Sequence, residues 1–280
     1  MKKNIILILK GMIIGLANII PGVSGGTLMI TLGIYEQVIN TISHFFKNLK
    51  ENLKFVIPLG IGLVLALLLF SKIISLSLSK YPFATTLFFL GLIIGGIPLI
   101  IKNMNKNKDS KKVSNYIIAF ISFAFIIIFA MLKSNNVVNL NNLSFIKIIL
   151  LFLVGITSAA TMVIPGVSGS FVLMLLGYYK PIIDTIKNIT NFNMLSHNII
   201  VLGIFGIGIL IGIVLVSKLI EMLLKKYETK TYFAVFGFVV ASLIAIIKPV
   251  FSYKINILEI IIGIILLLVG AYSTYKISKN

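Results

Sequence analysis

Two short stretches of the chain carry residue types that can bind an anion. Residues 21–27 read PGVSGGT and residues 165–171 read PGVSGSF, so the same motif occurs twice. Hydroxyl and backbone amide groups donate hydrogen bonds, and donors at the start of a helix favour an anion such as phosphate. About four to six charge-assisted hydrogen bonds, each contributing about 1.5–3 kcal/mol, would offset much of the cost of an unpaired phosphate in hydrocarbon. The alternative is that small residues let two helix breaks pack closely.

The anion contacts are expected from the small and polar members of the two motifs. They are Pro21, Gly22, Ser24, Gly25, Gly26 and Thr27 in the first motif, and Pro165, Gly166, Ser168, Gly169 and Ser170 in the second. Proline lacks a backbone donor and glycine adopts non-helical angles, so each motif interrupts a helix. Inside a membrane such a break is tolerated where it is buried in protein or lines a polar cavity, which favours a binding site.

Four charged residues in or near apolar segments are further candidates. Lys72 and Lys218 could attract a phosphate headgroup to the two mouths of a transport path, and snorkelling to the interface is the alternative. Glu36 and Asp184 could couple transport to a proton or sodium ion if they are buried, because a carboxylate inside a membrane costs about 2.5–3.5 kcal/mol. A position at the water boundary is the alternative for both carboxylates.

The residue inventory offers little for catalysis. The chain has no cysteine and two histidines, and its 25 basic residues are all lysines. It contains no Ser/His/Asp set, no paired carboxylates and no Cys/His cluster, so we expect no enzyme activity, no metal site and no cofactor.

The composition is that of an all-α, polytopic membrane protein. The 280 residues are 59% hydrophobic and only 11% charged. The apolar runs have roughly the 17–25 residues that cross a bilayer as a helix. The lysines lie between these runs, which indicates anchoring at the membrane surface and contact with membrane lipids rather than with nucleic acid.

An internal repeat extends well beyond the two motifs. At a spacing of 144 residues, Gly33, Tyr35 and Thr41 recur as Gly177, Tyr179 and Thr185, and at a spacing of 146 residues, Ser71, Lys72, Lys80, Tyr81, Thr85 and Gly91 recur as Ser217, Lys218, Lys226, Tyr227, Thr231 and Gly237. The first repeat is predicted over 1–144, with a hairpin at 4–46 and spans at 55–79, 83–101 and 115–133. The second is predicted over 145–280, with a hairpin at 145–186 and spans at 198–224, 231–250 and 255–275.

Parity predicts that the two repeats are inverted. A hairpin returns to the side it left, whereas three spans carry the chain across, so the second repeat starts on the opposite face. The lysine-rich loop 102–112 is expected in the cytoplasm, as are both termini, and the uncharged loop 134–142 outside. We favour re-entrant hairpins, each with one arm before its motif and one after it, over hairpins that span fully. Inverted repeats with broken helices are the plan of many secondary transporters, and a stable bundle without transport is the alternative.

The chain resembles the polyprenyl-phosphate transporter family, formerly a membrane domain of unknown function. The resemblance covers nearly the whole chain and rests on the two motifs, LGIYE at 32–36, LGYY at 176–179 and Lys248-Pro249. The family commonly has Gly-Met-Tyr at 177–179 and Trp-Pro at 248–249, so the chain departs from the pattern at these two places.

The resemblance implies a transporter, a flippase in the plasma membrane. It would return undecaprenyl phosphate, or a similar polyprenyl monophosphate, from the outer to the inner leaflet for reuse in cell-envelope polymer synthesis. The phosphate is expected between the two motifs while the isoprenoid tail stays in the bilayer. The partners are then this lipid and a coupling ion, and a homodimer is left open. A small inorganic-anion carrier or channel and a polyprenyl pyrophosphate phosphatase are the competing functions.

Overall fold

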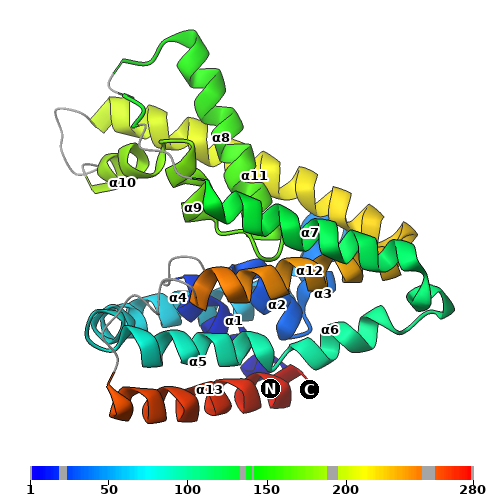
Figure 1. Cartoon of the computed structure of the whole chain (residues 1–280). Helices are drawn as coiled ribbons and strands as arrows, with labels where there is room; N and C mark the ends of the chain where they lie inside the picture. Colours follow the sequence, from blue (N-terminus) through cyan, green and yellow to red (C-terminus); the bar gives the residue numbers. More distant parts are fainter. Residues whose placement is uncertain are drawn as a thin grey trace.

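The described part of the protein is entirely helical. The structure is a computed structural model that describes residues 2–18, 24–132, 137–140, 142–187, 195–247 and 256–278. Within these ranges every regular element is a helix and no strand occurs (Figure 1). The predicted all-α fold is confirmed.

Long helices make up most of the structure. They are α1 (Lys2–Asn18), α4 (Leu49–Lys80), α5 (Pro82–Ile94), α7 (Val113–Met131), α8 (Phe145–Val163), α11 (Leu195–Lys226), α12 (Glu228–Ile247) and α13 (Ile257–Ser278). A shorter helix, α6 (Ile97–Met104), continues α5, and a 3₁₀ turn, η1 (Lys108–Lys111), precedes α7. Seven of the described helical segments are long and apolar enough to cross a membrane, α5 and α6 counting as one. Their outer faces expose large apolar side chains such as Leu68, Phe120 and Leu210, as a surface facing lipid requires.

Each motif is followed by two short helices instead of one continuous arm. In the first half these are α2 (Gly25–Thr31) and α3 (Tyr35–Ser43), and in the second half α9 (Gly169–Leu175) and α10 (Tyr179–Lys187). The expectation of one continuous arm after each motif was wrong, because Gly33 and Gly177 have φ of +70° and +79° and end the first helix. A backbone bond closes each end, from Ile34 N–H to the Met29 carbonyl and from Tyr178 N–H to the Leu173 carbonyl, the pattern of a Schellman motif.

Corresponding helices of the two halves pack in corresponding ways. Helix α1 lies against α4, and α8 lies against α11. A Cβ atom on Gly11 would come within 2.1 Å of the Leu59 carbonyl oxygen, and one on Gly155 within 2.5 Å of the Phe205 carbonyl oxygen. These two contacts fall at the repeat spacings of 144 and 146 residues, so the sequence repeat is also a repeat of helix packing.

The last helix of each half packs against the other half. Helix α13 lies along α5, and α7 lies along α12 (Figure 1). The closest contacts in these two helix pairs correspond as well. A Cβ atom on Gly91 would lie 2.1 Å from the Leu267 carbonyl oxygen, and one on Gly237 would lie 2.1 Å from the Ala119 carbonyl oxygen. The two halves are therefore interlocked and bury a shared core.

Helix α2 lies at the centre of this core. It packs against α1, α3, α5, α6 and α8, and its Leu28 is fully buried, as is Leu32 directly after it. This position holds the start of α2, with the first motif, against the end of α8, which leads into the second.

Candidate anion-binding site

The two motifs are in direct contact. The Gly166 N–H donates to the Thr27 hydroxyl oxygen at 2.8 Å, and the Tyr35 hydroxyl donates to the Val163 carbonyl at 3.0 Å. A Cβ atom on Gly26 would lie 3.1 Å from that same carbonyl oxygen, so the first motif packs closely against the end of α8. These contacts join the starts of α2 and α3 to the end of α8 and to the second motif. Of the predicted site residues, Pro21 and Gly22 lie outside the described residues.

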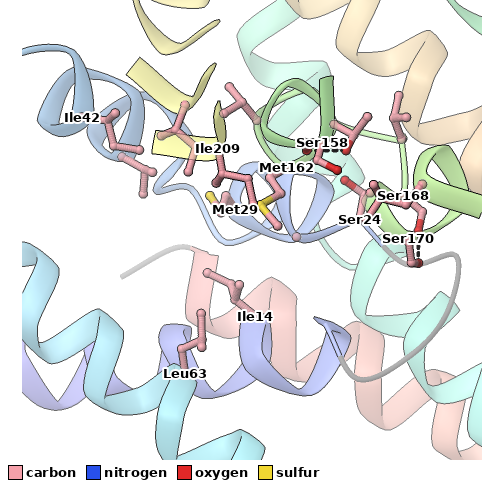
Figure 2. A pocket seen from close by; sticks show the side chains of 18 of the residues that line it. Ile14, Ser24, Met29, Ile42, Leu63, Ser158, Met162, Ser168, Ser170 and Ile209 are labelled. Carbon is pink, nitrogen blue, oxygen red and sulfur yellow. Dashed lines mark hydrogen bonds between the residues drawn. The ribbon is translucent and has the colours of Figure 1, made fainter. Parts of the chain in front are cut away.

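A cavity of about 560 Å³ opens beside this contact (Figure 2). Of the predicted site residues it is lined by Ser24, Gly25, Ser168, Gly169 and Ser170, and Val167 of the second motif lines it as well. Gly26, Thr27, Pro165 and Gly166 do not line it, and all four are buried. The structure thus divides the predicted residues into those that face the cavity and those that are buried beside it.

The motif serines do not cap the helices that follow them. Ser24 and Ser168 occupy the N-cap positions of α2 and α9 with extended backbones, yet neither hydroxyl accepts from its helix. An N-cap serine ordinarily accepts a bond from the first turn. The Ser168 hydroxyl instead bonds to the Ser170 hydroxyl at 3.0 Å, and the Ser24 hydroxyl is buried without any partner in the described structure. The Ser24 hydroxyl is therefore available to a ligand in the cavity.

Helix α8 adds a polar residue that the motif-based prediction missed. Ser158 lines the cavity, is 2% exposed and has no hydrogen-bond partner among the described residues. One turn later Thr161 also lines the cavity, and its hydroxyl donates to the Ser158 carbonyl at 2.6 Å. The signal in the sequence is the run TSAAT at 157–161, which places small and hydroxyl residues inside an otherwise apolar arm.

Apart from Tyr35 and Tyr179, the rest of the cavity is lined by apolar side chains. Its walls there include Ile14, Val38, Ile39, Ile42, Leu63, Ile182, Ile186, Phe205, Ile209 and Ile213. Figure 2 shows the serines gathered at one end, with Ile14 and Leu63 across the space from them. A cavity with a polar end and apolar walls suits an amphiphile better than a bare ion.

The predicted lysines lie elsewhere, and an unpredicted one is buried. Lys72 and Lys218 are exposed on α4 and α11, and neither lines the cavity. Lys10 is 6% exposed inside α1, one turn before the cavity residue Ile14, and the described structure gives it no carboxylate partner. The feature of the sequence that could have indicated Lys10 is its position as a single lysine within the first apolar run.

The two carboxylates proposed for coupling lie outside this cavity. Asp184 is half-buried and lines a separate cavity of about 350 Å³ with Lys180 and His197. Glu36 is exposed and lines another, of about 390 Å³, that also contains Glu221. Any coupling by these groups to a ligand at the serines has to act through the helices between them.

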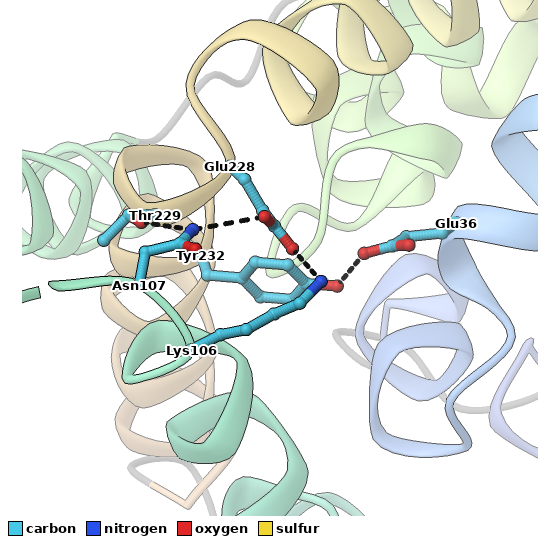
Figure 3. Close-up of polar contacts among 6 residues, drawn as sticks. All are labelled: Glu36, Lys106, Asn107, Glu228, Thr229 and Tyr232. Atoms are coloured by element: carbon cyan, nitrogen blue, oxygen red, sulfur yellow. Dashed lines mark hydrogen bonds and ion pairs between the residues drawn. The ribbon is translucent and has the colours of Figure 1, made fainter. Parts of the chain in front are cut away.

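A polar network joins α3 to α12 and to the segment after α6 (Figure 3). The Tyr232 hydroxyl donates to Glu36, and Lys106 pairs with Glu228 at 2.7 Å. The Glu228 carboxylate raises the pKa of Lys106 above its usual value through this hydrogen bond and its charge. Asn107 adds bonds to Glu228 and to Thr229. The Tyr232–Glu36 bond thus ties α3 to α12, and the bonds of Lys106 and Asn107 tie the segment after α6 to the start of α12.

Known proteins are similar in sequence to this chain over most of its length. A family model described as undecaprenyl phosphate translocase-like matches residues 14–258. A polyprenyl-phosphate transporter of Staphylococcus aureus is 32% identical over 94% of this chain and 92% of its own length. A polyprenyl-phosphate transporter of Vibrio cholerae is 28% identical over 89% of this chain and 80% of its own. No solved structure matches the chain. The chain belongs to the undecaprenyl phosphate translocase-like family.

Proposed function

We propose that the protein is a flippase that returns undecaprenyl phosphate, or a similar polyprenyl monophosphate, from the outer to the inner leaflet of the plasma membrane. The lipid would then be reused in cell-envelope polymer synthesis. The names of the relatives support a transporter of polyprenyl phosphate rather than an enzyme. The observation that carries the proposal is the cavity in which serines of both motifs meet at one end of an apolar chamber.

The phosphate binds at the serine end of the cavity. Ser24 and Ser168, with Ser170 and the nearby glycine amides, donate hydrogen bonds to its oxygens. The apolar walls receive the chain carbons next to the phosphate, while the remaining tail stays in the bilayer. Drawing the whole tail into protein is unnecessary, because each CH₂ already gains about 0.8 kcal/mol from burial in lipid.

The negative charge of the phosphate is balanced by lysine. Lys10 is buried on the face of α1 that also carries Ile14, and an unpaired cation in apolar surroundings is costly without a counter-ion. A bound phosphate supplies that counter-ion. Lys72 and Lys218 attract headgroups at the two membrane faces.

The two halves act as inverted repeats that alternate the opening of the cavity. Their matched helix pairs support the repeat. They differ in how their short helices pack, since α3 packs against α11 while α10 has no comparable packing against α4 in the described residues. Exchange of these two arrangements would move the opening from one membrane face to the other. Glu36 or Asp184 couples the exchange to a proton or sodium ion, and both termini lie in the cytoplasm.

The competing candidate is a carrier of small inorganic anions. It is tested by equilibrium binding to purified protein in detergent, with polyprenyl monophosphate as the ligand and inorganic phosphate as the competitor. We expect saturable binding of the lipid and no displacement by inorganic phosphate at a large excess. Displacement at concentrations similar to that of the lipid would overturn the amphiphile site and favour the anion carrier.

A further inference from the structure

We propose that Ser158 of α8 is a further hydroxyl contact of the phosphate, so that the phosphate lies between Ser24 and Ser158 on the α8 side of the cavity. This inference rests on the proposed function and extends it to a residue outside both motifs. The ligand chemistry it fits is a phosphate monoester attached to an apolar chain.

The first observation is that the Ser158 hydroxyl is unpartnered where its neighbours are not. Buried serine and threonine side chains on helices usually bond to a carbonyl three or four residues earlier. The buried Thr161 of the same helix does so at 2.6 Å, and the more exposed Thr157 does so at 2.9 Å. Ser158 does not, although it is 2% exposed and lines the cavity.

The second observation is that the Ser24 hydroxyl, at the same end of the cavity, is likewise buried and unpartnered in the described structure. Figure 2 shows Ser158 beside Ser24, with Ser168 and Ser170 next to them. Ser168 and Ser170 already bond to each other. The two unsatisfied hydroxyls are thus the donors that a ligand meets first, and a phosphate monoester offers three strong acceptor oxygens.

The repeat explains why this contact occurs on one side only. The residue 144 positions before Ser158 is Ile14, which lines the same cavity. One half therefore presents a hydroxyl and the other presents an apolar side chain at equivalent places. This difference places the additional hydroxyl contact on the α8 side of the phosphate.

The proposal predicts opposite effects of one substitution on stability and on binding. Removing an unsatisfied buried hydroxyl from the free protein is neutral or stabilising, so Ser158→Ala should keep or raise the unfolding temperature. Removing a hydrogen bond to a charged phosphate should weaken binding about tenfold or more. If Ser158 had only a structural role, its substitution would not weaken ligand binding while keeping or raising the unfolding temperature.

Ser217→Ala provides the matched control. Ser217 is fully buried and its hydroxyl also lacks a partner in the described structure, but it lies on α11 outside the cavity. The experiment measures the dissociation constant of a polyprenyl monophosphate and the unfolding temperature for wild type, Ser158→Ala, Ser217→Ala and the Ser24→Ala, Ser168→Ala double variant. Weakened binding by Ser158→Ala, with normal binding by Ser217→Ala, is the expected result.

The outcomes separate this proposal from the function on which it rests. Equal binding by Ser158→Ala and Ser217→Ala, with weak binding by the double variant, would overturn the role of Ser158 and leave the proposed function standing. Wild-type binding in the double variant, or no binding by wild type, would overturn both. If Ser158→Ala fails to fold, Ser158→Cys keeps the size but donates weakly, and it should also weaken binding.

Discussion

The hydrogen bond between the two motifs gives the most direct structural prediction. Thr27 is 1% exposed and its hydroxyl oxygen accepts from the Gly166 N–H at 2.8 Å. Thr27→Val keeps the shape of the side chain but removes this acceptor. A buried amide without a partner costs about 1–3 kcal/mol. At about 2–4 °C for each kcal/mol in a protein of roughly this size, the unfolding temperature should fall by several degrees.

Loss of the hydrogen bond between Gly166 and Thr27 should also weaken ligand binding. Without the bond, the start of α2 and the end of α8 are less firmly held, and the serines that line the cavity lose their relative position. The assay is thermal unfolding in detergent, followed by titration with polyprenyl monophosphate. Thr27→Ser, which keeps the hydroxyl, should restore most of the stability and binding.

Thr31→Val is the control for this prediction. Thr31 is as deeply buried, but its hydroxyl donates to the Leu28 carbonyl of its own helix, and that carbonyl also accepts from Leu32 N–H. Its loss leaves no buried group unpaired. If Thr27→Val and Thr31→Val unfold at the same temperature, the contact between the motifs does not stabilise the site as reasoned here.

Three further predictions concern residues around the site. Lys10→Leu should weaken binding of polyprenyl monophosphate while raising the unfolding temperature, and unchanged binding would show that Lys10 is not the counter-charge. Gly33→Ala should destabilise the protein by about 1–2 kcal/mol because Gly33 has a positive φ. Gly60→Ala should not, because a Cβ atom there meets open space. Equal unfolding temperatures of these two variants would refute the prediction. Tyr232→Phe removes the donor to Glu36 and should speed amide hydrogen exchange in α3; unaltered exchange would mean that the network does not hold this helix.

Much of the fold could be predicted because hydrophobic run length and internal repetition determine it. The apolar runs gave the long helices, and the repeat spacings give the positions at which Gly11 and Gly155 allow close packing. The break of each arm after a motif into two short helices was not predicted, although Gly33 and Gly177 recur at the repeat spacing. Nothing in their identity alone distinguishes a helical glycine from one that ends a helix with positive φ.

The site could be predicted only in part, because repeated sequence does not imply repeated surroundings. The residue 144 positions after Thr27 is Phe171, so the bond from Gly166 to Thr27 is specific to the first motif. Ser158 was missed because its importance depends on the direction of one hydroxyl, which packing decides. Lys72 and Lys218 share a repeat position, and the structure exposes both outside the cavity.

The central claim is that lipid phosphate crosses the membrane through the cavity where the two motifs meet. Its most direct test is the leaflet accessibility of a polyprenyl monophosphate in proteoliposomes that contain wild type or the Ser24→Ala, Ser168→Ala double variant. We predict rapid exchange between leaflets with wild type, and exchange near that of protein-free vesicles with the double variant. Equally rapid exchange with both proteins would contradict the claim.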